Sequence, residues 1–166
     1  ALYVIDPSGA IVDRYDKRFC SARELDKFSP GNHLSVVNIN GIRCGMLICN
    51  DSRFPEIYRE YRKLDVDIIF QSFHIARAPG PGVLSKVIPA TLQARAASNY
   101  FWISAPNSSA RFQSFPSLFI QPDGVIADSL RSNQDGVLIT EVNIDRSFYD
   151  ASEPFREQAM AGKLHS

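Results

Sequence analysis

One cysteine occupies a position where nucleophilic chemistry is possible. Cys49 ends an apolar run typical of a buried strand, residues 45–49, and the pattern predicts a helix over 53–64 directly after it. A strand-to-helix turn exposes a side chain and leaves backbone N–H groups free to bind an oxyanion, and a helix N-terminus favours the thiolate. Free cysteine is also among the most buried residue types, as expected for Cys44. The local pattern therefore leaves two interpretations of Cys49 open, a nucleophile or an inert core residue.

Polar side chains crowd the turn that follows Cys49. We interpret Asp51 and Arg53 as structural, because a paired, buried carboxylate and guanidinium could brace the turn without touching a substrate. Phe73 and His74 follow the next predicted strand, and loops after such strands often line a pocket. A core aromatic ring and a hydrogen-bonded histidine are the alternatives for these two residues.

The elements that must position these residues follow from hydrophobic periodicity and turn signals. The spacing predicts three hairpins, formed by residues 2–6 with 10–15, 34–39 with 42–48, and 118–121 with 125–130. It also predicts single strands over 66–70, 100–105 and 137–144. Helices are predicted over 53–64 and 89–99. We expect loops over 16–31 and 76–82 and an extended tail from Ser147, with the loop 75–84 shaping the pocket. Strand–helix–strand units beside hairpins indicate a mixed-sheet α/β or α+β layered domain.

Composition excludes several classes of protein. The chain has 166 residues, of which 45% are apolar and 22% charged, so whole-chain disorder is excluded. Eighteen basic residues balance eighteen acidic ones, and no apolar run approaches membrane-spanning length, so we expect neither a nucleic-acid nor a membrane partner. Three cysteines without zinc spacing predict no metal site and a reducing compartment, the cytoplasm.

Several segments in order carry a resemblance to one family. Residues 45–56, GMLICNDSRFPE, closely resemble the nucleophile motif of the nitrilase superfamily, the carbon–nitrogen hydrolases. Residues 14–17 are similar to its catalytic-lysine segment, 24–31 to its accessory glutamate and F-x-P-G element, 92–99 to its L-x-A-R-A-x-E-N helix and 122–124 to its D-P-x-G hairpin. The sequence departs from these motifs at Asn50, Phe19 and Ser98, where the family usually has an aromatic residue, His and Glu.

The resemblance implies a role for each site residue. Cys49 would attack an amide or nitrile carbon, and Lys17 and the backbone N–H of Asn50 would stabilise the oxyanion. Glu24 would orient Lys17 or relay protons. By residue type alone, Lys17 and Glu24 would be read as solvated surface charges. A thioester intermediate supplies the covalent catalysis, so we expect no cofactor.

The resemblance also implies a fold and an extent. We expect the α/β, nitrilase-like four-layer α-β-β-α sandwich, with residues 1–166 as the larger, C-terminal part of one carbon–nitrogen hydrolase domain. The chain begins at Ala1 inside a predicted strand, which agrees with N-terminal strands and helices, and the family's first catalytic glutamate, lying outside it. We therefore expect this fragment to be inactive by itself.

The function predicted on this basis is hydrolysis of a small amide or nitrile, with release of ammonia or an amine and a carboxylic acid. An amidase is favoured over a nitrilase because most relatives resemble amidases. Alternatives are a catalytically silent nitrilase-like binding protein and an acyltransferase that uses the same thioester. The aromatic residues of the helix 53–64 exceed one face, and relatives pair through such helices, so we expect a homodimer or larger even homo-oligomer with 53–64 and 89–99 at the contact.

Overall fold

The computed structural model describes residues 1–76 and 82–165. The strands are β1 (Leu2–Ile5), β2 (Ile11–Tyr15), β3 (Val36–Ile39), β4 (Ile42–Ile48), β5 (Ile68–Ser72), β6 (Trp102–Ala105), β7 (Leu118–Ile120) and β8 (Ile126–Ser129). The helices are α1 (Ala22–Leu25), the 3-10 helix η1 (Cys49–Arg53), α2 (Pro55–Lys63), α3 (Leu84–Asn99) and α4 (Arg156–Met160). Most of the predicted loop 76–82 lies outside the described residues.

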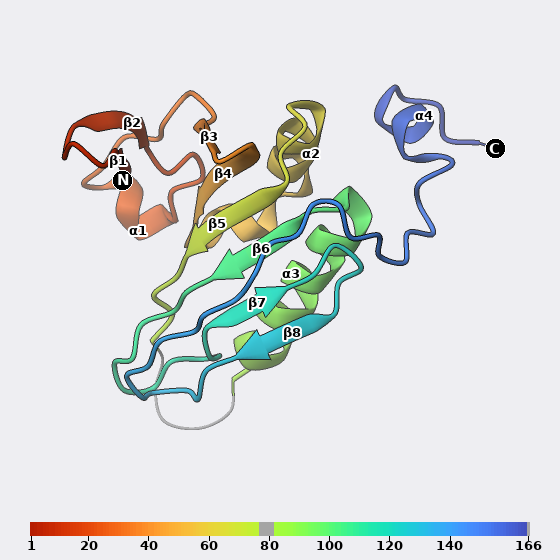
Figure 1. Cartoon of the computed structure of the whole chain (residues 1–166). Coiled ribbons are helices and arrows are strands. Elements are labelled where there is room, and N and C mark those ends of the chain that lie inside the picture. Colours follow the sequence, from red (N-terminus) through yellow and green to blue (C-terminus); the bar gives the residue numbers. More distant parts are fainter. Residues whose placement is uncertain (77–81, 166) are drawn as a thin grey trace.

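A six-stranded mixed sheet forms the centre, in the order β3-β4-β5-β6-β7-β8 (Figure 1). β4, β5 and β6 run parallel to one another. The pairs β3–β4, β6–β7 and β7–β8 are antiparallel. The β3–β4 hairpin turns at Asn40 and Gly41, whose φ angles of 53° and 89° are those of the predicted Asn-Gly turn. β1 and β2 form a separate antiparallel pair. The three parallel strands thus end at one edge of the sheet.

Two helices cover one face of the sheet. α2 and α3 contact each other, and α3 packs on β6 and β7 (Figure 1). Tyr58 and Tyr61 of α2 are fully buried here. Gly45 permits this approach, because an added Cβ would lie 2.8 Å from the Tyr61 ring. The aromatic residues of α2 therefore fill this chain's own core, which removes the excess aromatic surface from which we expected an interface.

The opposite face of the sheet is covered by extended chain, which corrects one prediction. The segment 137–144 does not form the predicted strand; it crosses this face without pairing (Figure 1). Its half-buried Leu138 and Val142 pack on a cluster around Trp102, which stacks on Phe119 with ring centroids 5.2 Å apart. Alternating apolar side chains can thus be buried by packing alone, without backbone pairing.

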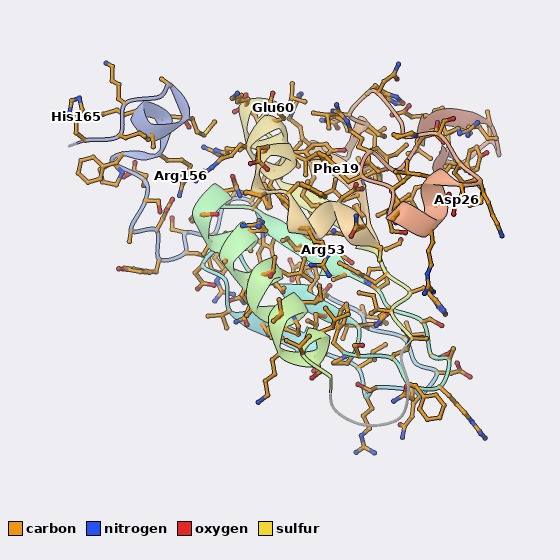
Figure 2. The ribbon with its side chains drawn as sticks, turned by 180° about the vertical axis from the view of Figure 1, so that it is seen from behind. Phe19, Asp26, Arg53, Glu60, Arg156 and His165 are labelled. Atoms are coloured by element: carbon orange, nitrogen blue, oxygen red, sulfur yellow. The ribbon has the colours of Figure 1, made fainter. Side chains whose placement is uncertain are left out.

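The helices also differ from the sequence pattern. α3 begins at Leu84, so that Pro89 lies inside it and leaves one backbone hydrogen bond of the helix unmade. The predicted loop 16–31 contains α1, and the predicted extended tail contains α4. Arg156 anchors this tail, because it is buried and donates to the carbonyl of Ser98 at 3.1 Å, next to the C-terminal end of α3 (Figure 2). None of the helices within the described ranges is long and apolar enough to cross a membrane.

Candidate active site

A pocket at the carboxyl edge of the parallel strands collects the predicted site residues. Cys49 lies directly after β4, with a φ of 43° that a non-glycine residue adopts only under constraint. It opens onto a pocket of about 320 Å³, a size typical of small-molecule sites. The lining residues are Lys17, Ser21, Glu24, Cys49, Asn50, Ser52, Arg53, His74, Ile75, Ala76, Leu84 and Ile88. Cys49, Lys17 and Glu24 thus share one pocket despite their separation in sequence.

Lys17 and Glu24 form a two-oxygen ion pair on this pocket. The Lys17 Nζ lies 2.8 Å from Oε1 and 2.7 Å from Oε2 of Glu24, and the lysine side chain is only 11% exposed. Ser21, which caps α1, donates its backbone N–H to Oε2 at 2.6 Å. Burial favours the neutral acid, but the hydrogen bonds from Lys17 and Ser21 outweigh it and lower the pKa of Glu24 from 4.5 to about 2. Glu24 therefore fixes the ammonium group as a carboxylate.

The Asp51 carboxyl connects the nucleophile turn to the lysine segment. It is fully buried and accepts hydrogen bonds from the Tyr15 hydroxyl at 2.8 Å, the Phe19 N–H at 2.9 Å and the Ile48 N–H at 2.9 Å. Burial raises the pKa of Asp51, while these hydrogen bonds lower it and leave a net increase. A structural role for Asp51 was expected, but with Arg53 as its partner.

The lysine segment is held against η1 by further contacts. The Phe19 ring stacks on Phe54 with centroids 3.7 Å apart, and the Asn50 side chain donates to the Phe19 carbonyl at 3.0 Å. Gly31 donates its N–H to the Lys17 carbonyl at 2.9 Å, and an added Cβ there would lie 2.2 Å from the Asp16 carbonyl oxygen. Glycine is therefore required where the chain returns past Lys17.

The thiol of Cys49 is not activated by its surroundings within the described residues. Burial raises its pKa, and Lys17 and the backbone N–H of His74 only partly oppose this effect. The net direction is opposite to the effect that we expected from the start of a helix. Desolvation is the largest cause of the raised pKa. A nucleophilic role for Cys49 would therefore require a base that accepts the thiol proton.

Three other predicted site residues have distinct positions. Arg53 is exposed and lines the pocket, and it makes no ion pair within residues 1–76 and 82–165, so the expected Asp51–Arg53 pair is wrong. His74 also lines the pocket with an exposed side chain. Phe73 is buried and packs edge-on against Phe115 with centroids 5.1 Å apart, so it is a core residue.

Sequence reasoning located Glu24 beside Lys17 but missed Ser21 and Tyr15, which support the lysine segment. The pattern Ser21-x-x-Glu24 is a capping box, a signal that could have located α1 and the Glu24 carboxylate together. Tyr15 reads as an ordinary strand residue, and its bond to Asp51 spans 36 positions that no local pattern connects. The described part of the chain contains no group of three or more His, Cys, Asp or Glu residues that could hold a metal ion.

Comparison with known proteins places this geometry in a family. A family model described as carbon-nitrogen hydrolase matches residues 1–147. A deaminated glutathione amidase of Dictyostelium discoideum is 26% identical over 157 residues, which cover 86% of this chain and 53% of that protein. An (R)-stereoselective amidase of Pseudomonas sp. is 33% identical over 66 residues, which cover 40% of this chain and 24% of that protein. The chain thus spans about half the length of the first relative and less of the second.

The fold matches that of solved amidases. The amidase of Nesterenkonia sp. AN1, a member of the nitrilase superfamily, superposes with a TM-score of 0.72 at 19% identity, over 96% of this chain and 61% of that one. A structure of the same amidase with the acetamide moiety of fluoroacetamide on its active-site cysteine gives a TM-score of 0.67 at 22% identity, over 77% of this chain and 49% of that one. The predicted α/β, nitrilase-like fold is therefore confirmed, and with the match over residues 1–147 the chain belongs to the carbon-nitrogen hydrolase family.

Proposed function

We propose that this chain carries the nucleophile and the oxyanion-stabilising groups of an amidase that cleaves a non-peptide carbon–nitrogen bond. The observation that carries the proposal is the convergence of Cys49 with the Lys17–Glu24 ion pair on one pocket. A half-buried thiol beside a fixed ammonium group has little structural use, but it suits acyl transfer. The names of the relatives support an amide rather than a nitrile substrate.

The first half of the reaction forms a thioester. A base takes the thiol proton, and Cys49 Sγ attacks the amide carbon to give a tetrahedral intermediate with negative charge on its oxygen. The Lys17 ammonium and the backbone N–H of Asn50 stabilise that charge. The C–N bond then breaks, the nitrogen takes up a proton and ammonia or an amine leaves.

The second half of the reaction returns the free enzyme. Water attacks the thioester carbon, the same groups stabilise the second oxyanion, and the C–S bond breaks to give a carboxylic acid and the thiol. Glu24, held as a carboxylate, keeps Lys17 aimed at the reacting carbon. The resemblance assigns the base that moves the protons to a glutamate outside this chain, which agrees with the raised pKa of Cys49.

We also propose a homodimer or larger even homo-oligomer for the whole protein, in a reducing compartment. All three cysteines are free, which suits the cytoplasm. The tail carries exposed apolar side chains, with Tyr149 79% and Leu164 86% exposed. Contact with a second subunit would bury this apolar surface.

Ammonia release by the full-length protein tests the proposed function. Butyramide and acrylamide are suitable first substrates, because both have been bound to the Nesterenkonia amidase. We expect turnover by the wild type and by Cys44→Ala, and loss of about 10³-fold or more for Cys49→Ala. Equal ammonia release by wild type and Cys49→Ala would refute the assignment.

A further inference from the structure

Arginine side chains gather where the tail meets the C-terminal ends of α2 and α3. They come from three helices, because Arg59 and Arg62 lie one turn apart on α2, Arg95 lies on α3 and Arg156 lies on α4. Figure 2 shows Arg156 between α4 and the other two helices. Arg59 and Arg156 donate to the same acceptor, the carbonyl of Ser98, at 2.9 and 3.1 Å. We call these four side chains the arginine cluster.

Repulsion within the arginine cluster is not balanced by its neighbours. Burial lowers the pKa of Arg59, and the other three guanidinium groups lower it further, so all three act on it at short range. Asp150 binds Arg156, and Glu157 lies 3.7 Å from Arg62. The two remaining arginines have no carboxylate within ion-pair distance in residues 1–76 and 82–165. Four guanidinium groups beside two carboxylates thus leave two positive charges without a counter-charge.

Two guanidinium groups of the arginine cluster also have unused donors. The Nε atoms of Arg62 and Arg95 are buried and have no hydrogen-bond acceptor within the described part of the chain. Arg95 lies over the Tyr58 ring, 5.7 Å from its centroid, so an aromatic contact holds it there. Both arginine side chains are half-buried, so an acceptor can reach them from solvent. A buried donor without an acceptor costs free energy, and each side chain gains if an anion supplies one.

The arrangement favours a phosphate over a carboxylate as that anion. A carboxylate presents two oxygens and one charge, whereas a phosphate monoester presents three acceptor oxygens and about two negative charges. The guanidinium groups come from two helices, and a tetrahedral anion offers an oxygen to each of them. A symmetric contact centred on this cluster would place two such clusters face to face, so a second copy of the chain is a poor source of the negative charge.

From these contacts we propose that the arginine cluster binds one phosphate or phosphate monoester per chain. Arg62 and Arg95 are its main ligands, because their buried donors lack acceptors, and Arg59 lies beside them. The bound anion joins α2 to α3 next to the point where Arg156 anchors the tail. The site shares no residue with the pocket around Cys49, so the inference is independent of the proposed amidase function.

Calorimetry with inorganic phosphate and the full-length protein tests the inference. At an ionic strength held constant with sodium chloride, we expect one phosphate per chain and a higher unfolding temperature than in chloride alone. Arg95→Gln should weaken binding about 10- to 100-fold, because it removes a charge-assisted hydrogen bond, and Arg95→Lys should recover part of the loss. Arg111→Gln, which removes an exposed arginine outside the cluster, is the matched control. Phenyl phosphate, titrated in parallel, distinguishes a monoester site from one that accepts the free ion only.

A variant that supplies the counter-charge gives an independent test. Ser98→Glu places a carboxylate beside the carbonyl that two of the arginines share. It should raise the unfolding temperature in chloride and weaken phosphate binding about 10-fold or more. Arg62→Gln, at a side chain that is 26% exposed, provides the same readout as Arg95→Gln if that variant does not fold.

Two results would overturn the phosphate site. One is phosphate affinity that is unchanged in both Arg62→Gln and Arg95→Gln, or stabilisation that chloride reproduces at the same ionic strength. The other is absence of phosphate binding together with a lower mass of Arg95→Gln by light scattering, which would assign the arginine cluster to an acidic surface of a partner subunit.

Discussion

At the level of single residues, Asp51 does more for the site than a bracing carboxyl in one turn. Its oxygens collect donors from β2, from the segment after Lys17 and from the end of β4. These are the segments that place the ammonium group and the thiol on the same pocket. Asp51 is therefore one buried side chain that, with the contacts of Phe19 and Asn50, fixes the relative position of Lys17 and Cys49.

Removing this carboxyl should destabilise the protein strongly. Asp51→Ala leaves a hydroxyl and two N–H groups without acceptors, and each costs about 1–3 kcal/mol when buried, so we expect a loss of about 3 kcal/mol or more in the free energy of unfolding. Tyr15→Phe removes one donor only and should cost about 1 kcal/mol. Urea denaturation measures both. Equal stability of Asp51→Ala and Tyr15→Phe would show that the backbone hydrogen bonds contribute nothing.

The Lys17–Glu24 pair should give stability a defined dependence on pH. Because folding lowers the pKa of Glu24 from 4.5 to about 2, its contribution is fully present above pH 4.5 and declines as the pH falls toward 2. The free energy of unfolding of wild type should exceed that of Glu24→Gln at pH 6, and the difference should shrink between pH 4.5 and 2. Glu153→Gln, on the exposed tail, is the control. A difference independent of pH would contradict the ion pair.

At the level of elements, the loop that carries Lys17 is shaped by a close approach of its own backbone. Gly31→Ala would place a Cβ 2.2 Å from the Asp16 carbonyl oxygen and would displace the lysine segment. We expect a loss of about 1–3 kcal/mol in stability and a larger loss in kcat than in KM. Gly82→Ala meets no atom within 4 Å and is the matched control. Normal turnover in Gly31→Ala would mean that Lys17 does not need this loop.

The sequence predicts an element well where its signal is local. It predicts an element poorly where a contact with a distant segment determines the structure. The Asn40-Gly41 hairpin and the apolar strand before Cys49 have strong local signals, and both are present. The segment 137–144 has a strand pattern but forms no strand. It packs its apolar side chains on the face of the sheet and does not pair with the edge strand β8. At the site, the motifs located Cys49, Lys17 and Glu24, whereas two of the donors that bind Asp51 lie 32 and 36 positions away in the sequence, where no local pattern connects them.

At the level of the whole molecule, the tail is the surface that we propose for assembly. Arg156 fastens it to the end of α3, but Tyr149 and Phe155 before this anchor and Leu164 after it remain exposed. We expect the full-length protein to be a dimer or larger even oligomer at micromolar concentration, and Leu164→Asp to lower its mass by light scattering. Lys163→Asp, which changes charge without removing apolar surface, is the control. A monomer mass for the wild-type full-length protein would refute the assembly.

The central claim is that Cys49 becomes covalently acylated during amide hydrolysis, and trapping of the acyl group tests it most directly. Full-length protein is mixed with an amide substrate, quenched in acid during turnover and analysed by peptide mass spectrometry. The account predicts one acyl group on the peptide that contains Cys49 in wild type, a larger accumulated fraction when water attack is slowed at low pH, and none in Cys49→Ala. An acyl group on Cys20 or Cys44, or turnover by Cys49→Ala at the wild-type rate, would contradict it.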